Sequence, residues 1–171
     1  VTEGVTEPVL LLPSTVSPHK FQLRPSQIRL LADADIIFWI GPHFESFLAR
    51  SLSQARFVDR QVALSAVETL NQLENRASAY WQHEHDSEPL RAFSVAQAHP
   101  YDPHIWLDPI NAGTLVDEIA RRMGVLDPDN LEDYRRNADR YKRRLEELDR
   151  HLDVALEPVR HLPFLVFHDA Y

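Results

Sequence analysis

The chain contains no cysteine among its 171 residues. This absence excludes a disulfide framework and any metal site built on thiolates. A metal ion would have to be bound by histidine, aspartate, glutamate or water. The nine histidines are therefore the side chains on which a metal-binding hypothesis depends.

Glycine and positive charge are also scarce. Four glycines against 12 prolines indicate stiff connections between elements. Lysine and arginine number 18 against 26 acidic residues, and the net charge of −8 argues against a nucleic-acid partner. No apolar run is long enough to span a bilayer, and no signal peptide is visible at the start. The remaining composition, 44% hydrophobic and 26% charged, is typical of a soluble globular chain.

The first third of the chain alternates short apolar runs with helical patterns. The predicted strands are Val9–Leu12, Ile36–Ile40 and Phe57–Leu64, and the predicted helices are Ser26–Ala34 and Pro42–Leu52. This rhythm predicts an α/β fold, with a parallel sheet and flanking helices. Ligands of such sheets bind at the carboxyl ends of the strands, which here includes the loops after Leu12 and Ile40.

The second half is predominantly helical. A helix to about Met123 begins either at Asn111 or at Asp108, with Pro109 in its first turn. Residues 129–156 form the longest periodic segment, which predicts either a coiled-coil arm or a rigid spine between two lobes. An apolar run at Phe164–Phe167 predicts a strand and favours the spine. The expected organisation is an incomplete N-terminal lobe at 1–127 with a polar loop at 70–100, a long helix at 128–158, and the start of a second lobe at 159–171.

Three histidines stand where a turn or a strand ends: His19 in SPHKF, His104 in DPHIW and His168 in FHDAY. Three imidazoles from separate loops plus one oxygen suit Zn²⁺. The competing interpretation is that each is an ordinary surface or core histidine. For DPHIWLDP in particular, the alternative is a structural turn in which Trp106 is the packing residue and His104 has no role in binding.

The segments SPHKFQLRPSQIRLLADADIIFWIGPHFESFL, DPHIWLDPINA and FHDAY resemble the periplasmic zinc-binding proteins of bacterial high-affinity zinc uptake ABC transporters. The resemblance implies two α/β lobes joined by a long helix, with zinc bound between them by His19, His104 and His168. Manganese-binding relatives carry a carboxylate at the third position, so His168 favours zinc. The resemblance also implies that this chain lacks the first strand and helix of that fold and most of its C-terminal lobe.

The polar stretch WQHEHDSE is similar to the His-rich and acid-rich loop of these zinc proteins. His83, Glu84, His85 and Asp86 form a possible secondary metal site, and the alternative is a solvated polar loop. Water is expected as the fourth ligand of the main site, with Glu84 or Asp86 as further candidates. Around the main site, Asp102 and Asp108 are candidate acceptors for an imidazole N–H, and Trp106 is expected to pack behind His104. Helix capping is the alternative role for Asp108.

The sequence therefore predicts a monomeric, extracytoplasmic or periplasmic carrier rather than an enzyme. Neutral imidazoles would capture Zn²⁺ and pass it to the membrane permease of an ABC transporter, with no small organic substrate. One alternative is a three-histidine zinc hydrolase, although neither an HExxH pair nor a nucleophile elbow is present. Others are a manganese-binding or adhesin member of the same family and a structural helical module. The remaining histidines are expected at the surface: His43, His99, His151 and His161.

Overall fold

The computed structural model describes residues 1–13, 21–74 and 101–166. Within these ranges, two short strands and four α-helices form the fold, together with short 3-10 helices. The strands are β1 (Ile37–Trp39) and β2 (Gln61–Ala63), and the helices are α1 (Pro25–Asp33), α2 (Ser46–Leu52), α3 (Pro109–Leu126) and α4 (Leu131–Leu156). The 3-10 helices are η2 (Ala55–Phe57), η3 (Leu64–Ala66), η4 (Ile105–Leu107), η5 (Pro128–Asn130) and η6 (Glu157–Val159).

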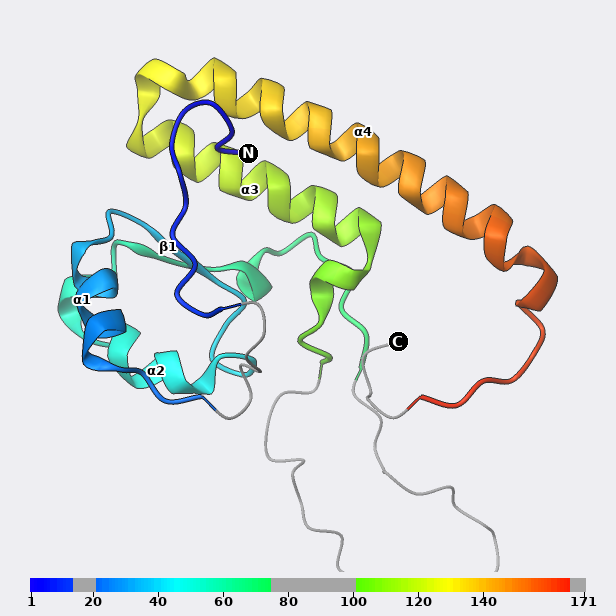
Figure 1. Cartoon of the computed structure of the whole chain (residues 1–171), viewed down its shortest axis with the longest axis horizontal. Coiled ribbons are helices and arrows are strands. Elements are labelled where there is room, and N and C mark those ends of the chain that lie inside the picture. Colours follow the sequence, from blue (N-terminus) through cyan, green and yellow to red (C-terminus); the bar gives the residue numbers. More distant parts are fainter. Residues whose placement is uncertain (14–20, 75–100, 167–171) are drawn as a thin grey trace, which may run out of the picture.

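β1 and β2 pair in parallel, with Phe38 opposite Val62. Side chains alternate along β1, so its two faces join different cores. Ile37 and Trp39 are buried in a cluster with residues of α1 and α2. Phe38 packs on the opposite face, against the clusters that α3 contributes to. The strand pair therefore lies between a layer of α1 and α2 and a layer of α3 and α4 (Figure 1).

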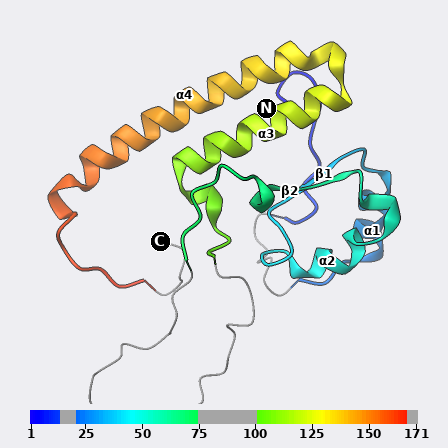
Figure 2. The ribbon, with the colours of Figure 1, turned by 180° about the vertical axis from the view of Figure 1, so that it is seen from behind.

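α3 and α4 form an antiparallel hairpin, seen from both sides in Figures 1 and 2. Tyr134 is only 1% exposed between them, and its hydroxyl donates to Asp127 Oδ2 over 2.8 Å. Burial is the main reason that the pKa of Tyr134 is raised to about 12. Lys142 Nζ reaches Asp117 on α3 at 2.8 Å, which adds a polar tie between the two helices.

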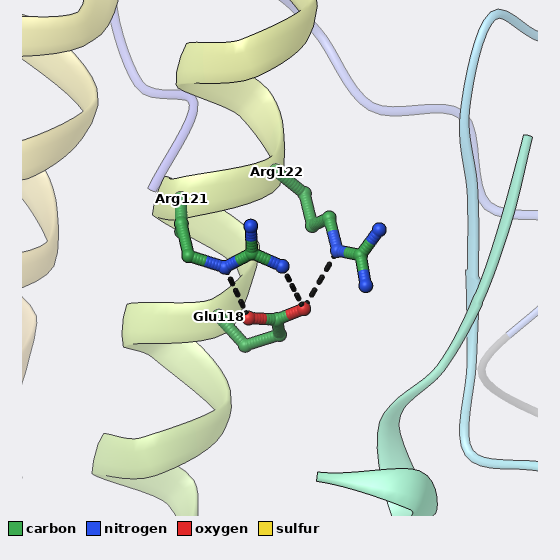
Figure 3. A network of polar contacts seen from close by, with 3 residues as sticks. All are labelled: Glu118, Arg121 and Arg122. Carbon is green, nitrogen blue, oxygen red and sulfur yellow. Dashed lines mark hydrogen bonds and ion pairs between the residues drawn. The ribbon is translucent and has the colours of Figure 1, made fainter.

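On α3 itself, one carboxylate binds two guanidinium groups (Figure 3). Glu118 accepts from Arg121 Nε at 2.7 Å and from Arg122 Nε at 2.7 Å. These residues lie three and four positions apart, the spacing that brings side chains together on a helix. The hydrogen bond from Arg121 is the largest cause of a lowered pKa for Glu118, which falls to about 2.

The first residues of the chain pack onto α4, although they are far away in sequence. The amide of Asn137 donates to the carbonyl oxygens of Val1 and Glu3, each over 2.8 Å. Val1 and Val5 pack against the core between α3 and α4. In Figure 1 the N-terminus accordingly lies beside these two helices.

The α/β class, the parallel pair and the long helix are confirmed. α1 and α3 begin within a turn of their predicted starts, and the N-cap of α3 is Asp108, whose side chain accepts from Ile110 N at 2.8 Å. α2 begins at Ser46, because residues 42–44 form a turn rather than the predicted first helical turn. β2 covers only the second half of the predicted strand, since Phe57 belongs to η2 and residues 58–60 form a turn.

One predicted strand is wrong, and another lies only partly within the described residues. Val9 and Leu10 are 72% and 76% exposed, and the Leu11 carbonyl accepts from the Gln27 side chain at 2.7 Å instead of from a neighbouring strand. The predicted strand at Phe164–Phe167 is described up to residue 166, and these residues form no strand. Phe164 and Leu165 are 79% and 94% exposed. Apolar composition alone indicates a strand, but a strand needs a pairing partner, and neither run has one in the described part of the chain.

The sequence predicts that no apolar run is long enough to span a bilayer, and the helices of the structure test this prediction. Across residues 1–13, 21–74 and 101–166, every helix is too short or too polar to cross a bilayer.

Candidate metal centre

The carboxyl ends of β1 and β2 are held together beyond the strands. Ser65 N donates to Ile40 O over 2.9 Å, so the pairing continues one step past each strand. Gly41 follows with a φ of +149°, and a Cβ at this position would lie 2.5 Å from Ser65 Oγ. Glycine is required here both for its backbone conformation and for the close approach of Ser65 on η3.

Glu45 fixes the turn that leaves β1. Its carboxylate accepts the backbone N–H groups of Ile40 at 3.2 Å and Gly41 at 3.0 Å. Burial raises the pKa of Glu45, and the two backbone hydrogen bonds oppose that rise. Sequence reasoning missed this residue. A signal was present, because an acidic side chain six residues after a strand end and just before a helix is well placed to accept from the turn.

The segment that contains His104 enters beside this turn. Asp102 N donates to Leu73 O over 2.8 Å, and this bond anchors the segment to the chain that follows β2. Asp102 Oδ1 lies 2.6 Å from His104 Nδ1 and also accepts from His104 N at 2.9 Å. One carboxylate oxygen therefore binds both the main chain and the ring of the same histidine.

Aromatic rings flank His104. The Phe44 ring lies edge-on to His104, with centroids 5.5 Å apart, and the Trp106 ring lies at 5.4 Å. Phe44 and Trp106 contact each other at 4.9 Å. The His104 side chain is only 10% exposed. The packing predicted for Trp106 against His104 is thus present, and Phe44 is a further contact that sequence reasoning did not find.

This arrangement has a defined chemistry. An ionised carboxylate only accepts hydrogen bonds, so the proton of a neutral His104 is placed on Nδ1. The lone pair then lies on Nε2, the nitrogen that a metal ion would take. A carboxylate behind the imidazole is the arrangement that commonly orients a histidine ligand and raises its basicity.

The helix after His104 is anchored separately. Asp108 caps α3, which agrees with the capping role considered for it. Asn111, 2% exposed, exchanges two hydrogen bonds with the backbone of Asn71, each 2.8 Å long. These bonds join the start of α3 to the chain that follows β2. A small pocket lies among these elements and is lined by Gly41, His43, Ser65, Gln72, Tyr101 and Asp102.

The other predicted metal-binding residues fall outside the described residues. They are His19, His83, Glu84, His85, Asp86 and His168. Within the described ranges, histidines and acids nowhere gather in a group of three that could hold a metal ion. His104 and Asp102 are therefore the part of the predicted site whose geometry the structure gives, and the three-histidine set stays a prediction.

Comparison with known proteins identifies relatives. The family described as "ZnuA: Zinc-uptake complex component A periplasmic" matches residues 1–171. The "High-affinity zinc uptake system protein ZnuA" of Brucella abortus (strain 2308) is 32% identical over 193 residues, covering 100% of this chain and 58% of that protein. The protein of the same name from Yersinia pestis is 30% identical, covering 100% and 56%. The chain thus spans less than three-fifths of the length of these relatives.

Solved structures share the fold. A ZnuA deletion mutant lacking residues 138–173, solved with zinc bound, superposes with a TM-score of 0.71 at 27% identity, covering 94% of this chain and 54% of that one. Zn(II)-bound AdcA from Streptococcus pneumoniae gives a TM-score of 0.74 at 21% identity, covering 99% and 32%. At that lower identity the second likeness supports the fold alone.

Proposed function

Since the chain belongs to the ZnuA family of periplasmic zinc-uptake components, we propose that it is part of an extracytoplasmic zinc-binding protein. In this proposal His104 binds Zn²⁺ through Nε2, together with His19 and His168. The bound ion is cargo, which the protein delivers to the permease of an ABC transporter. The names of the relatives describe zinc uptake, a transport role, which favours a carrier over the hydrolase alternative.

The observation that carries the proposal is the Asp102–His104 pair. The 2.6 Å contact fixes the ring, and its place at the carboxyl ends of parallel strands is where α/β folds bind ligands. An incidental histidine in a turn would not need a carboxylate that binds its backbone and its ring at once. Zinc is the cation that suits imidazole ligands in a chain without cysteine.

A calorimetric zinc titration, after dialysis against a chelator, tests this function. We expect stoichiometric binding by the parent chain and its loss in His104→Ala. His151→Ala is the matched control, because His151 lies on the exposed surface of α4, and this variant should bind like the parent. Equal binding by His104→Ala and the parent would refute the assignment of His104. Zinc-dependent hydrolysis that requires His104 would instead support the enzyme alternative.

A further inference from the structure

Phe44 connects two parts of the structure that approach His104 from different directions. Phe44 lies on the turn after β1, whereas His104 and Trp106 lie just before α3. Its ring contacts both, at 5.5 Å and 4.9 Å. Asp102 holds one nitrogen of the imidazole through a hydrogen bond, and Phe44 packs against the ring itself. A hydrogen bond alone leaves a ring able to rotate about the bonded atom, so the packing contact supplies the second restraint.

The position of Phe44 depends in turn on Glu45. Phe44 N donates to Gly41 O at 3.1 Å, and Glu45 N donates to the same oxygen at 2.9 Å. The Glu45 carboxylate closes the turn from the other side by accepting from Ile40 and Gly41. Both carboxylate oxygens are used, one for each N–H. This half-buried carboxylate therefore links the residues that follow β1 to the start of α2, with Phe44 inside the closed turn.

We propose that Glu45 is a positioning residue for metal binding, which sets the orientation of the His104 ring by holding Phe44 against it. The proposal rests on the proposed function for its effect on zinc. Its structural part, the link from Glu45 through Phe44 to His104, does not need a metal. The two parts can therefore fail separately.

The first experiment examines the metal-free chain by long-range ¹H–¹⁵N spectra of the imidazoles, with the His104 signal assigned from its loss in His104→Ala. The parent should show the Nδ1–H tautomer and ring-proton shifts from the facing aromatic rings. Glu45→Ala should change these shifts in the same direction as Phe44→Leu. An unchanged His104 signal in Glu45→Ala would overturn the proposal, whatever the zinc affinity.

The second experiment measures zinc affinity by competition with a chromophoric chelator. Residues that orient a metal ligand typically change affinity by about 10- to 100-fold, and we expect Glu45→Ala to weaken binding by about 10-fold. Glu45→Gln keeps one acceptor oxygen and should recover part of the loss. The double variant Phe44→Leu with Glu45→Ala should bind no more weakly than the weaker single variant, because both changes break one link.

Glu118→Gln provides the control for stability. Glu118 makes comparable hydrogen bonds on α3 but has no part in the turn after β1. This variant should lower the melting temperature without changing zinc affinity. Zinc affinity that falls equally in Glu118→Gln and Glu45→Ala would show a general loss of stability and would refute a positioning role. Zinc binding that is insensitive to His104→Ala, with the spectral link intact, would refute the proposed function but not the Glu45–Phe44–His104 link.

Discussion

At the scale of single residues, Asp102 Oδ1 restrains both the backbone and the side chain of His104. It accepts from both the backbone and the ring of His104, at 2.9 and 2.6 Å. Removing it would leave the tautomer of the ring unfixed and its orientation restrained only by aromatic packing. The local fold would be less affected, because Asp102 N is anchored independently through Leu73 O.

We therefore expect Asp102→Ala to weaken zinc binding by about 10- to 100-fold, the usual cost of losing a partner behind a metal ligand. Asp102→Asn retains an acceptor and should lie between Ala and the parent. Chelator competition measures the affinity, and circular dichroism checks the fold. An affinity that is unchanged in Asp102→Ala, in a folded protein, would contradict a role for this pair in zinc binding.

The sequence made some of these residues predictable and others not. His104, Asp102 and Trp106 stand within five positions of one another, so local spacing was enough to group them. Phe44 is 60 residues away from His104, and only the fold brings it there. From the sequence, Gly41 was likewise expected only to end the strand Ile36–Ile40. Glycine is needed there because of its φ of +149° and because Ser65 Oγ, on η3, would lie 2.5 Å from an added Cβ.

At the scale of elements, helices were easier to predict than strands. A helix satisfies its own hydrogen bonds, so caps and periodicity indicate it locally, as Asp108 and Pro109 do for α3. A strand needs a partner that can lie anywhere in the chain. Ile36–Ile40 found one in β2, whereas Val9–Leu12 has equal apolar character and no ladder. Composition could not distinguish these two runs.

α3 also carries a testable response to acid. The pKa of Glu118 is lowered from 4.5 to about 2, first by its hydrogen bond from Arg121. A carboxyl whose pKa is lower in the folded state stabilises the fold above its unfolded pKa. That stability is lost as the pH falls from about 4.5 towards 2. Because Arg121 and Arg122 are 56% and 45% exposed, we expect a contribution of only about 1 kcal/mol.

Urea unfolding at pH 7 and at pH 2.5 measures this contribution. Glu118→Gln should reduce the free energy of unfolding at pH 7 and make it less dependent on pH between these values. Glu132→Gln is the control, since Glu132 pairs with Arg135 at 2.8 Å but is 80% exposed. It should change stability by less than about 0.5 kcal/mol. The prediction fails if Glu118→Gln keeps the pH dependence of the parent.

At the scale of the whole molecule, α4 is unevenly supported. Its buried residues, Tyr134, Asn137 and Ala138, all lie in the first third. Further along, Leu148 and Leu152 are 47% and 40% exposed, and Val154 is 77% exposed. Tertiary packing supplies most of the stability of a helix in a protein. The two ends of α4 should therefore differ in local stability.

Amide hydrogen exchange tests this difference. Amides up to Tyr141 should exchange slowly, at rates close to those of the buried side of α3, whereas amides from Leu145 to Leu156 should exchange much faster. The apolar residues in the second half should not slow exchange, because they cover no core in the described structure. Uniform protection along α4 would show that another part of the chain, or a second copy, covers its outer half.

Because only the first part of α4 is packed, a change of angle there displaces its far end. From Lys142, which contacts Asp117 on α3, to Leu156 the helix extends about 21 Å, at 1.5 Å per residue. Over that length a tilt of about 10° at the α3 contact becomes a displacement of about 4 Å at the far end. A small change of angle between α3 and α4 therefore moves the far end of α4 by about the width of a side chain. The packing around Tyr134 and Lys142 therefore determines the direction in which the chain leaves α4 at Leu156.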